Sequence, residues 1–177
     1  MSPVELLVGR HSVLAATGSV LGDVRAGAGQ FLLIGGEAGI GKTAVLAALI
    51  NQAEPDWFVL QGFCWEGSGA RPYWPWSQVL RASGLSRAQL REAGWLLDAT
   101  SEPAQLATPT GSMSAAAATD AQFRLFEAVS GCLKELAVDR PLLVVIDDLH
   151  WADEPSVRLL GFLAGVLASS RINRTNR

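Results

Sequence analysis

The stretch GEAGIGKT at residues 36–43 follows an apolar run, FLLI at residues 31–34. Its glycines, lysine and threonine have the spacing of a phosphate-binding loop, in which glycines let the backbone approach phosphates and turn successive N–H groups toward an anion. That motif needs a strand before it and a helix after it, and the run at residues 43–50 has helix-forming character. The sequence therefore predicts a nucleoside triphosphate site. The alternative, a glycine-rich turn that binds nothing, is disfavoured by this context.

The loop residues have distinct expected roles. Lys42 is expected to neutralise the β- and γ-phosphates as a catalytic group, and the Thr43 hydroxyl is expected to help hold Mg²⁺. The helix that begins near Lys42 places its positive end under the same charge. The predicted nucleotide-binding residues are Gly36, Glu37, Ala38, Gly39, Ile40, Gly41, Lys42 and Thr43.

A second informative stretch is RPLLVVIDDLHWAD at residues 140–153. Its apolar run fits a parallel strand buried on both faces, with Asp147 and Asp148 at the carboxyl end, where open α/β sheets bind ligands. Asp147 is predicted to hold Mg²⁺ together with Thr43, through water, and Asp148 to polarise the attacking water as a general base. Carboxylates also end strands for structural reasons, so this interpretation depends on the loop upstream.

The two residues after the acids are less specific. Trp151 is interpreted as a packing residue under the helix that follows. His150 could contact the γ-phosphate or cap the turn, and both alternatives stay open.

These stretches, preceded by LVGR at residues 7–10, resemble the Orc1-like AAA ATPase module, a P-loop NTPase found at the head of large ATP-binding regulators of the LuxR type and related signal-transduction ATPases. The resemblance extends to about Leu167, and DDLHWAD at residues 147–153 is its most specific part. YWPW at residues 73–76 matches an aromatic, proline-rich loop of such modules. The resemblance implies that three residues lie beside the adenine: Val8, Gly9 and Arg10.

The chain departs from the family after the acid-bearing strand. The family continues with a helix, two further strands, an arginine finger and a helical lid, whereas here a helical pattern at residues 154–167 is followed by polar residues. We therefore expect a truncated module of reduced stability and little turnover. Because the absent fourth strand would lie between the loop strand and the acid strand, these two would face each other across an empty slot or collapse together. Arg71 and Arg158 are candidates for the finger in residue type only.

The elements alternate between helix and strand, which predicts an α/β, three-layer P-loop NTPase fold with a parallel, incomplete sheet. Helices are expected at about residues 12–25, 43–52, 120–137 and 154–167, with two more beginning at residues 76 and 86, and strands at residues 31–34, 57–60 and 142–146. The helix at residues 120–137 carries five residues at core spacing: Phe123, Phe126, Val129, Leu133 and Leu136.

Composition bounds the remaining possibilities. The 177 residues, 49% of them hydrophobic, predict one ATPase domain at residues 1–170, with a flexible insertion at about 98–119 and a polar tail at 171–177. A net charge of −3 gives no basic footprint for nucleic acid. No apolar run suits a membrane span and no secretory signal is evident, so a cytoplasmic location is expected. Cys64 and Cys132 form no metal or redox motif and are expected to be reduced.

Together these features predict ATP binding with Mg²⁺, and slow or conditional hydrolysis as a signalling switch. A nucleotide-gated interaction module without turnover, capable of self-association, is one alternative. A small-molecule kinase is another, and it would require an acceptor pocket. The absence of an Asn-Lys-x-Asp guanine-reading motif favours adenine by the family comparison.

Overall fold

The computed structural model describes residues 11–37, 39–53, 56–67, 71–97 and 115–172. Its strands β1 and β2 pair in parallel, from Phe58 opposite Leu142 to Phe63 opposite Asp147, so the expected α/β class and parallel pairing are confirmed. The elements in chain order are α1 (His11–Arg25), α2 (Lys42–Ala53), β1 (Phe58–Phe63), α3 (Trp74–Ala82), α4 (Arg87–Leu90), the 3₁₀ helix η2 (Arg91–Leu97), α5 (Ala115–Leu136), β2 (Leu142–Asp147), the 3₁₀ helix η4 (Leu149–Trp151) and α6 (Glu154–Ile172).

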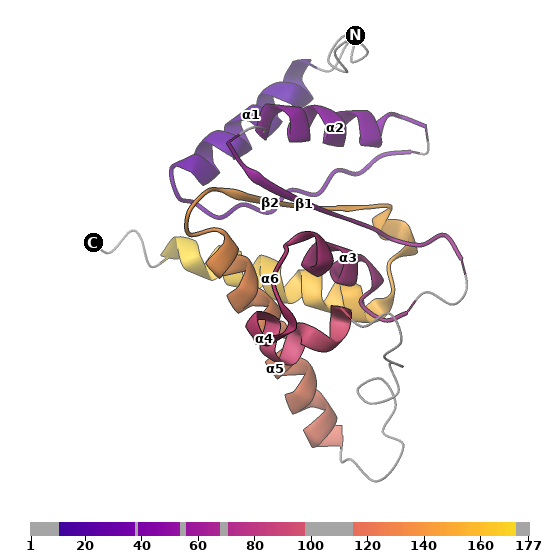
Figure 1. Cartoon of the computed structure of the whole chain (residues 1–177). Coiled ribbons are helices and arrows are strands. Elements are labelled where there is room, and N and C mark those ends of the chain that lie inside the picture. The colour runs from indigo at the N-terminus through magenta and orange to yellow at the C-terminus, as the bar shows by residue number, and fades with distance from the viewer. Residues whose placement is uncertain (1–10, 38, 54–55, 68–70, 98–114, 173–177) are drawn as a thin grey trace.

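The elements form three layers (Figure 1). Helices α1 and α2 lie on one face of the two strands, and α3, α5 and α6 lie on the other. A small apolar cluster joins α1, α2 and the start of the strands, and a larger one fills the opposite side. The larger cluster is built on the buried residues Tyr73, Trp76, Leu80, Leu90, Ala93, Leu96, Leu125, Phe126, Val129, Cys132 and Leu159.

The strand expected at Phe31–Ile34 is not formed. This segment makes no backbone hydrogen bond to another described residue, and the side chains of Phe31, Leu32 and Leu33 are 48%, 41% and 66% exposed. Only Ile34 packs, against the buried residues of α2. A strand needs a partner at its edge, and neither β1 nor β2 pairs with this segment. The segment before the phosphate-binding loop and the acid-bearing strand β2 are therefore not paired, so the expected alternative in which these two strands collapse together does not occur.

The outer edge of β1 is closed by α3. The Gln78 side-chain amide donates to the Phe63 carbonyl at 2.9 Å, and the Phe63 N–H donates back to the Gln78 side-chain oxygen at 3.4 Å. One residue earlier, a Cβ on Gly62 would lie 2.4 Å from the Pro75 carbonyl oxygen, so only glycine admits α3 this closely. This contact fixes the start of α3 beside the carboxyl end of β1.

Several expected boundaries were wrong. Helix α5 begins at Ala115, because the alanine run at residues 115–118 favours helix strongly, and the rest of the expected insertion, residues 98–114, lies outside the described residues. Helix α6 continues to Ile172, past the expected start of the polar tail. Strand β1 extends to Phe63, and α3 begins at Trp74. Within α5, Phe126 and Val129 are buried as expected, whereas Phe123 is 50% exposed.

Candidate functional site

The loop at residues 36–41 has a backbone that favours glycine. Gly39 and Gly41 have φ angles of 75° and 89°, which lie in the left-handed region that other residues rarely adopt. At Gly36, an added Cβ would lie 2.9 Å from Cγ2 of Ile40. The three glycines of the sequence motif are thus needed for local geometry. Ala38 lies outside the described residues, as do Val8, Gly9 and Arg10.

Lys42 is the first residue of α2, and its side chain turns back into the loop. Its Nζ donates to the carbonyl oxygens of Gly36 and Glu37, each at 3.0 Å. Thr43 is exposed in the first turn of the helix. The ammonium group and the positive end of α2 therefore lie on the same loop, an arrangement that suits an anion such as a phosphate.

The two acids lie where β2 ends. Asp147 is half-buried, its Oδ1 accepts the Asp148 N–H at 2.8 Å, and its carbonyl accepts the Cys64 N–H at 3.1 Å. Asp148 is exposed and left-handed, with φ 55° and ψ 39°, and its carbonyl accepts the Trp151 N–H at 2.8 Å. Sparsely populated backbone angles of this kind cluster at functional sites. The chain thus turns sharply after β2, leaving one acid held and the other open to solvent.

Cys64 reports on the electrostatics of this end of the sheet. Burial, and to a smaller extent the carboxylates of Asp153, Asp148 and Asp147 in that order, raises the pKa of its thiol to about 11. The thiol is therefore protonated at neutral pH, and three negative groups lie near it. Both Cys64 and Cys132 are free and buried.

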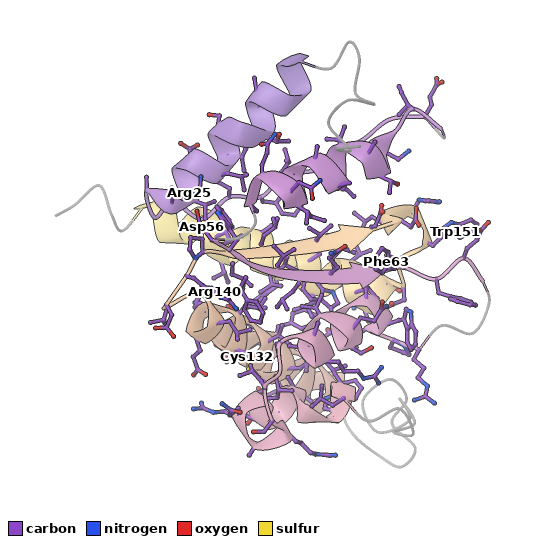
Figure 2. All side chains as sticks on the ribbon, turned by 45° about the horizontal axis from the view of Figure 1, so that its top comes forward. Arg25, Asp56, Phe63, Cys132, Arg140 and Trp151 are labelled. Atoms are coloured by element: carbon purple, nitrogen blue, oxygen red, sulfur yellow. The ribbon has the colours of Figure 1, made fainter. Side chains whose placement is uncertain are left out.

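The phosphate-binding loop and the acids lie on the same side of the molecule (Figure 1). Figure 2 shows Phe63 and Trp151 at this end and the Arg25–Asp56 ion pair at the other. Within the described part of the chain, neither Lys42 nor Thr43 makes a hydrogen bond or ion pair with Asp147 or Asp148. The loop and the acids therefore lie on the same side of the molecule without a hydrogen bond or ion pair between these side chains.

The other residues singled out in the sequence are at the surface. Trp151 is 44% exposed, so its expected packing under the following helix was wrong, because η4 turns the ring outward before α6 begins. Its ring lies 5.1 Å from that of His150, which is also exposed. Arg71 is exposed, and the Arg158 guanidinium is paired with Glu154 at 2.5 Å.

Sequence reasoning assigned no role to Asp153, yet it is a central hydrogen-bond acceptor of this edge. Its Oδ1 accepts the N–H of Tyr73 at 3.0 Å and that of Ser156 at 2.8 Å, and its Oδ2 accepts the Ser156 hydroxyl at 2.7 Å. The available signal was an Asp directly before a helical pattern, the position of an N-cap. The bond to Tyr73 had no local signal.

A model of the family described as AAA ATPase domain matches residues 6–174. The chain belongs to this family. The match includes the loop, both acids and every helix and strand described above. Neither the curated proteins nor the solved structures contain a match to the chain.

AAA ATPase domains bind ATP with Mg²⁺, and the residues here suit that ligand. The loop offers a lysine, a helix N-terminus and left-handed glycines, and the sheet edge offers carboxylates. No group of three or more His, Cys, Asp and Glu side chains that could hold a metal was found among the described residues. None of the helices, as far as they are described, is long and apolar enough to cross a membrane.

Proposed function

We propose that this AAA ATPase domain binds Mg-ATP between the loop at residues 36–43 and the carboxyl end of β2, and hydrolyses it slowly as a signalling switch. The observation that carries the proposal is the combination of left-handed Gly39 and Gly41 with Lys42 at the start of α2, on the same side as the two acids. The resemblance of the sequence to the ATP-binding regulators of the LuxR type supports the signalling role.

In this proposal the loop residues bind and orient the phosphates. Lys42 exchanges the carbonyls of Gly36 and Glu37 for β- and γ-phosphate oxygens, because a charge-assisted bond to phosphate is stronger than one to a neutral carbonyl. The loop N–H groups and the positive end of α2 stabilise the same charge. The left-handed glycines keep the backbone close enough for these contacts.

The acids perform the remaining steps. Thr43 and Asp147 would hold Mg²⁺, which would supply neutralisation of the phosphate charge. Asp148, exposed and one residue further, orients a water and accepts its proton. The left-handed turn at Asp148 separates the two carboxylates, so that one can bind the metal while the other faces solvent.

Slow turnover follows from what the site lacks among its described residues. Arg158 is engaged with Glu154, and Arg71 is exposed, so neither is held toward the phosphates as an arginine finger would be. An arginine finger contributes about 10³- to 10⁵-fold to such reactions. We therefore expect turnover well below about 1 s⁻¹, the lower end of common enzyme rates.

A second candidate is a nucleotide-gated interaction module without turnover. It is favoured by the exposed side chains of Phe31, Leu32 and Leu33, which directly precede the phosphate-binding loop. Exposed apolar groups close together mark interaction sites in many proteins. A change in molecular size that occurs equally with ATP and a non-hydrolysable analogue would favour this candidate over the switch.

Thermal unfolding with and without Mg-ATP tests the binding step. A ligand at a hundred times its dissociation constant adds about 2.7 kcal/mol to the free energy of unfolding. We expect wild type and Lys134→Ala to shift and Lys42→Ala not to shift. Lys134 is a matched control because it is an exposed lysine on α5, in the opposite layer. Equal shifts in all three proteins, or a shift in none, would refute the assigned site.

A further inference from the structure

Asp153 makes more contacts than a helix cap requires. An N-cap side chain satisfies one N–H of the first helical turn, and the bond from the Ser156 N–H does this. Asp153 also accepts the Ser156 hydroxyl and the Tyr73 N–H, which comes from a residue 80 positions earlier in the chain. Ser156 and Tyr73 are only 2% and 6% exposed, and Asp153 is half-buried, so these bonds lie at the margin of the core.

Tyr73 is itself held in place for this contact. It has a left-handed backbone, with φ 63°, a conformation that a bulky residue adopts only when its surroundings enforce it. Its ring packs edge-on against Trp95 and Phe126, at centroid distances of 6.0 and 6.3 Å, and its hydroxyl accepts a bond from Gln122 at 3.3 Å. The contacts of the Tyr73 side chain therefore hold its backbone N–H in position to donate to Asp153.

The turn between β2 and α6 is attached to the β1–α3 connection at both of its ends. At its start, the Cys64 N–H donates to the Asp147 carbonyl at 3.1 Å. At its end, Asp153 binds Tyr73, and the Trp76 indole N–H donates to the Ser156 carbonyl at 3.1 Å. Between these attachments the turn carries Asp148. The position of Asp148 thus depends on the hydrogen bonds that Asp153 accepts.

We propose that Asp153 is a positioning residue that holds the acid-bearing turn, and with it Asp147 and Asp148, in register for Mg²⁺ and water. The inference rests on the proposed nucleotide site. A group that orients a metal ligand from outside the coordination sphere commonly contributes about 10- to 100-fold to metal affinity. Loss of the Asp153 hydrogen bonds would weaken the Mg²⁺-dependent part of ATP binding and leave binding by the phosphate-binding loop unchanged, because those bonds come from Tyr73 and Ser156.

Two substitutions separate this role from a simple cap. Asp153→Ser keeps an N-cap oxygen for the Ser156 N–H, but it is too short to bind Tyr73 as well. Asp153→Asn keeps an acceptor oxygen for both N–H groups. The affinity of the full chain for ATP is measured by calorimetry with Mg²⁺ and with EDTA. We expect the Mg²⁺-dependent gain in affinity to fall about tenfold or more in Asp153→Ser and to remain near wild type in Asp153→Asn. An unchanged gain in Asp153→Ser would overturn the proposal.

Amide hydrogen exchange of the free protein keeps the inference testable if wild type binds no ATP, an outcome that would defeat the proposed function alone. We expect Asp153→Ser to speed exchange at Tyr73 and Trp151 at least about tenfold, while Val45 in α2 stays unchanged, because local opening sets exchange rates. The Trp151 N–H is bonded to Asp148, so it reports on the acid-bearing turn directly. Unchanged exchange at Trp151 would show that the turn does not depend on Asp153.

Discussion

The candidate site has two halves, the phosphate-binding loop at residues 36–43 (the loop half) and the turn after β2 that carries Asp147 and Asp148 (the acid half). They differ in the contacts that hold them in place. The acid half is joined to the end of β1 by Cys64 and to the start of α3 by Tyr73 and Trp76, and the large apolar cluster lies behind it. The loop half follows Phe31–Ile34, whose backbone has no described partner. Packing on α2 is its main support. The difference indicates that the acid half is already formed before ligand binds, whereas the loop half stands to gain most order from a nucleotide.

The largest expected difference between the halves is in stability. Leu80 is fully buried in the large apolar cluster, and Leu80→Ala should lower the free energy of unfolding by about 2–5 kcal/mol. Leu33, which precedes the phosphate-binding loop, is 66% exposed. Leu33→Ala should change the free energy of unfolding by less than about 0.5 kcal/mol. Urea unfolding of both variants provides the measurement. A large cost at Leu33 would show that the segment is covered in solution and would remove the contrast.

A smaller effect is expected from a pair of glycines. Gly62→Ala would drive a Cβ against the Pro75 carbonyl and should cost about 1–3 kcal/mol through displacement of α3. Gly35→Ala meets nothing within 4 Å and should be close to neutral. Thermal unfolding of the two variants compares the halves with the same chemical change. An equal loss of stability in the two variants would mean that α3 does not approach β1 this closely in solution.

An effect confined to alkaline pH is expected at Cys64. Because burial raises the pKa of Cys64 from an ordinary thiol value of 9.0 to about 11, the folded chain keeps this proton between pH 9 and 11 while the unfolded chain loses it. The free energy of unfolding should therefore be unaffected by Cys64 below pH 9 and should fall as pH rises from 9 toward 11. Comparing wild type with Cys64→Ala isolates the contribution. An identical slope in the two proteins would mean that the thiol is open to solvent.

Local features were the ones that the sequence could predict. The glycine geometry of the loop, the start of α2 at Lys42 and the acids at the end of β2 depend on neighbouring residues. The strand at Phe31–Ile34 could not be judged locally, because a strand exists only through a partner at its edge. The orientation of Trp151 depends on η4, and that of Phe123 on how α5 meets α6.

The acid half differs from the loop half also in when it can form. The Tyr73–Asp153 and Trp76–Ser156 bonds each join residues 80 apart, and β1 pairs with a strand at a comparable separation. Contacts of such long range form slowly, because a long loop must close before they stabilise anything. During synthesis, α1, α2 and the loop leave the ribosome well before Asp147 and α6 exist. A nascent chain thus carries the phosphate-binding loop while the residues between it and the acids are still being added.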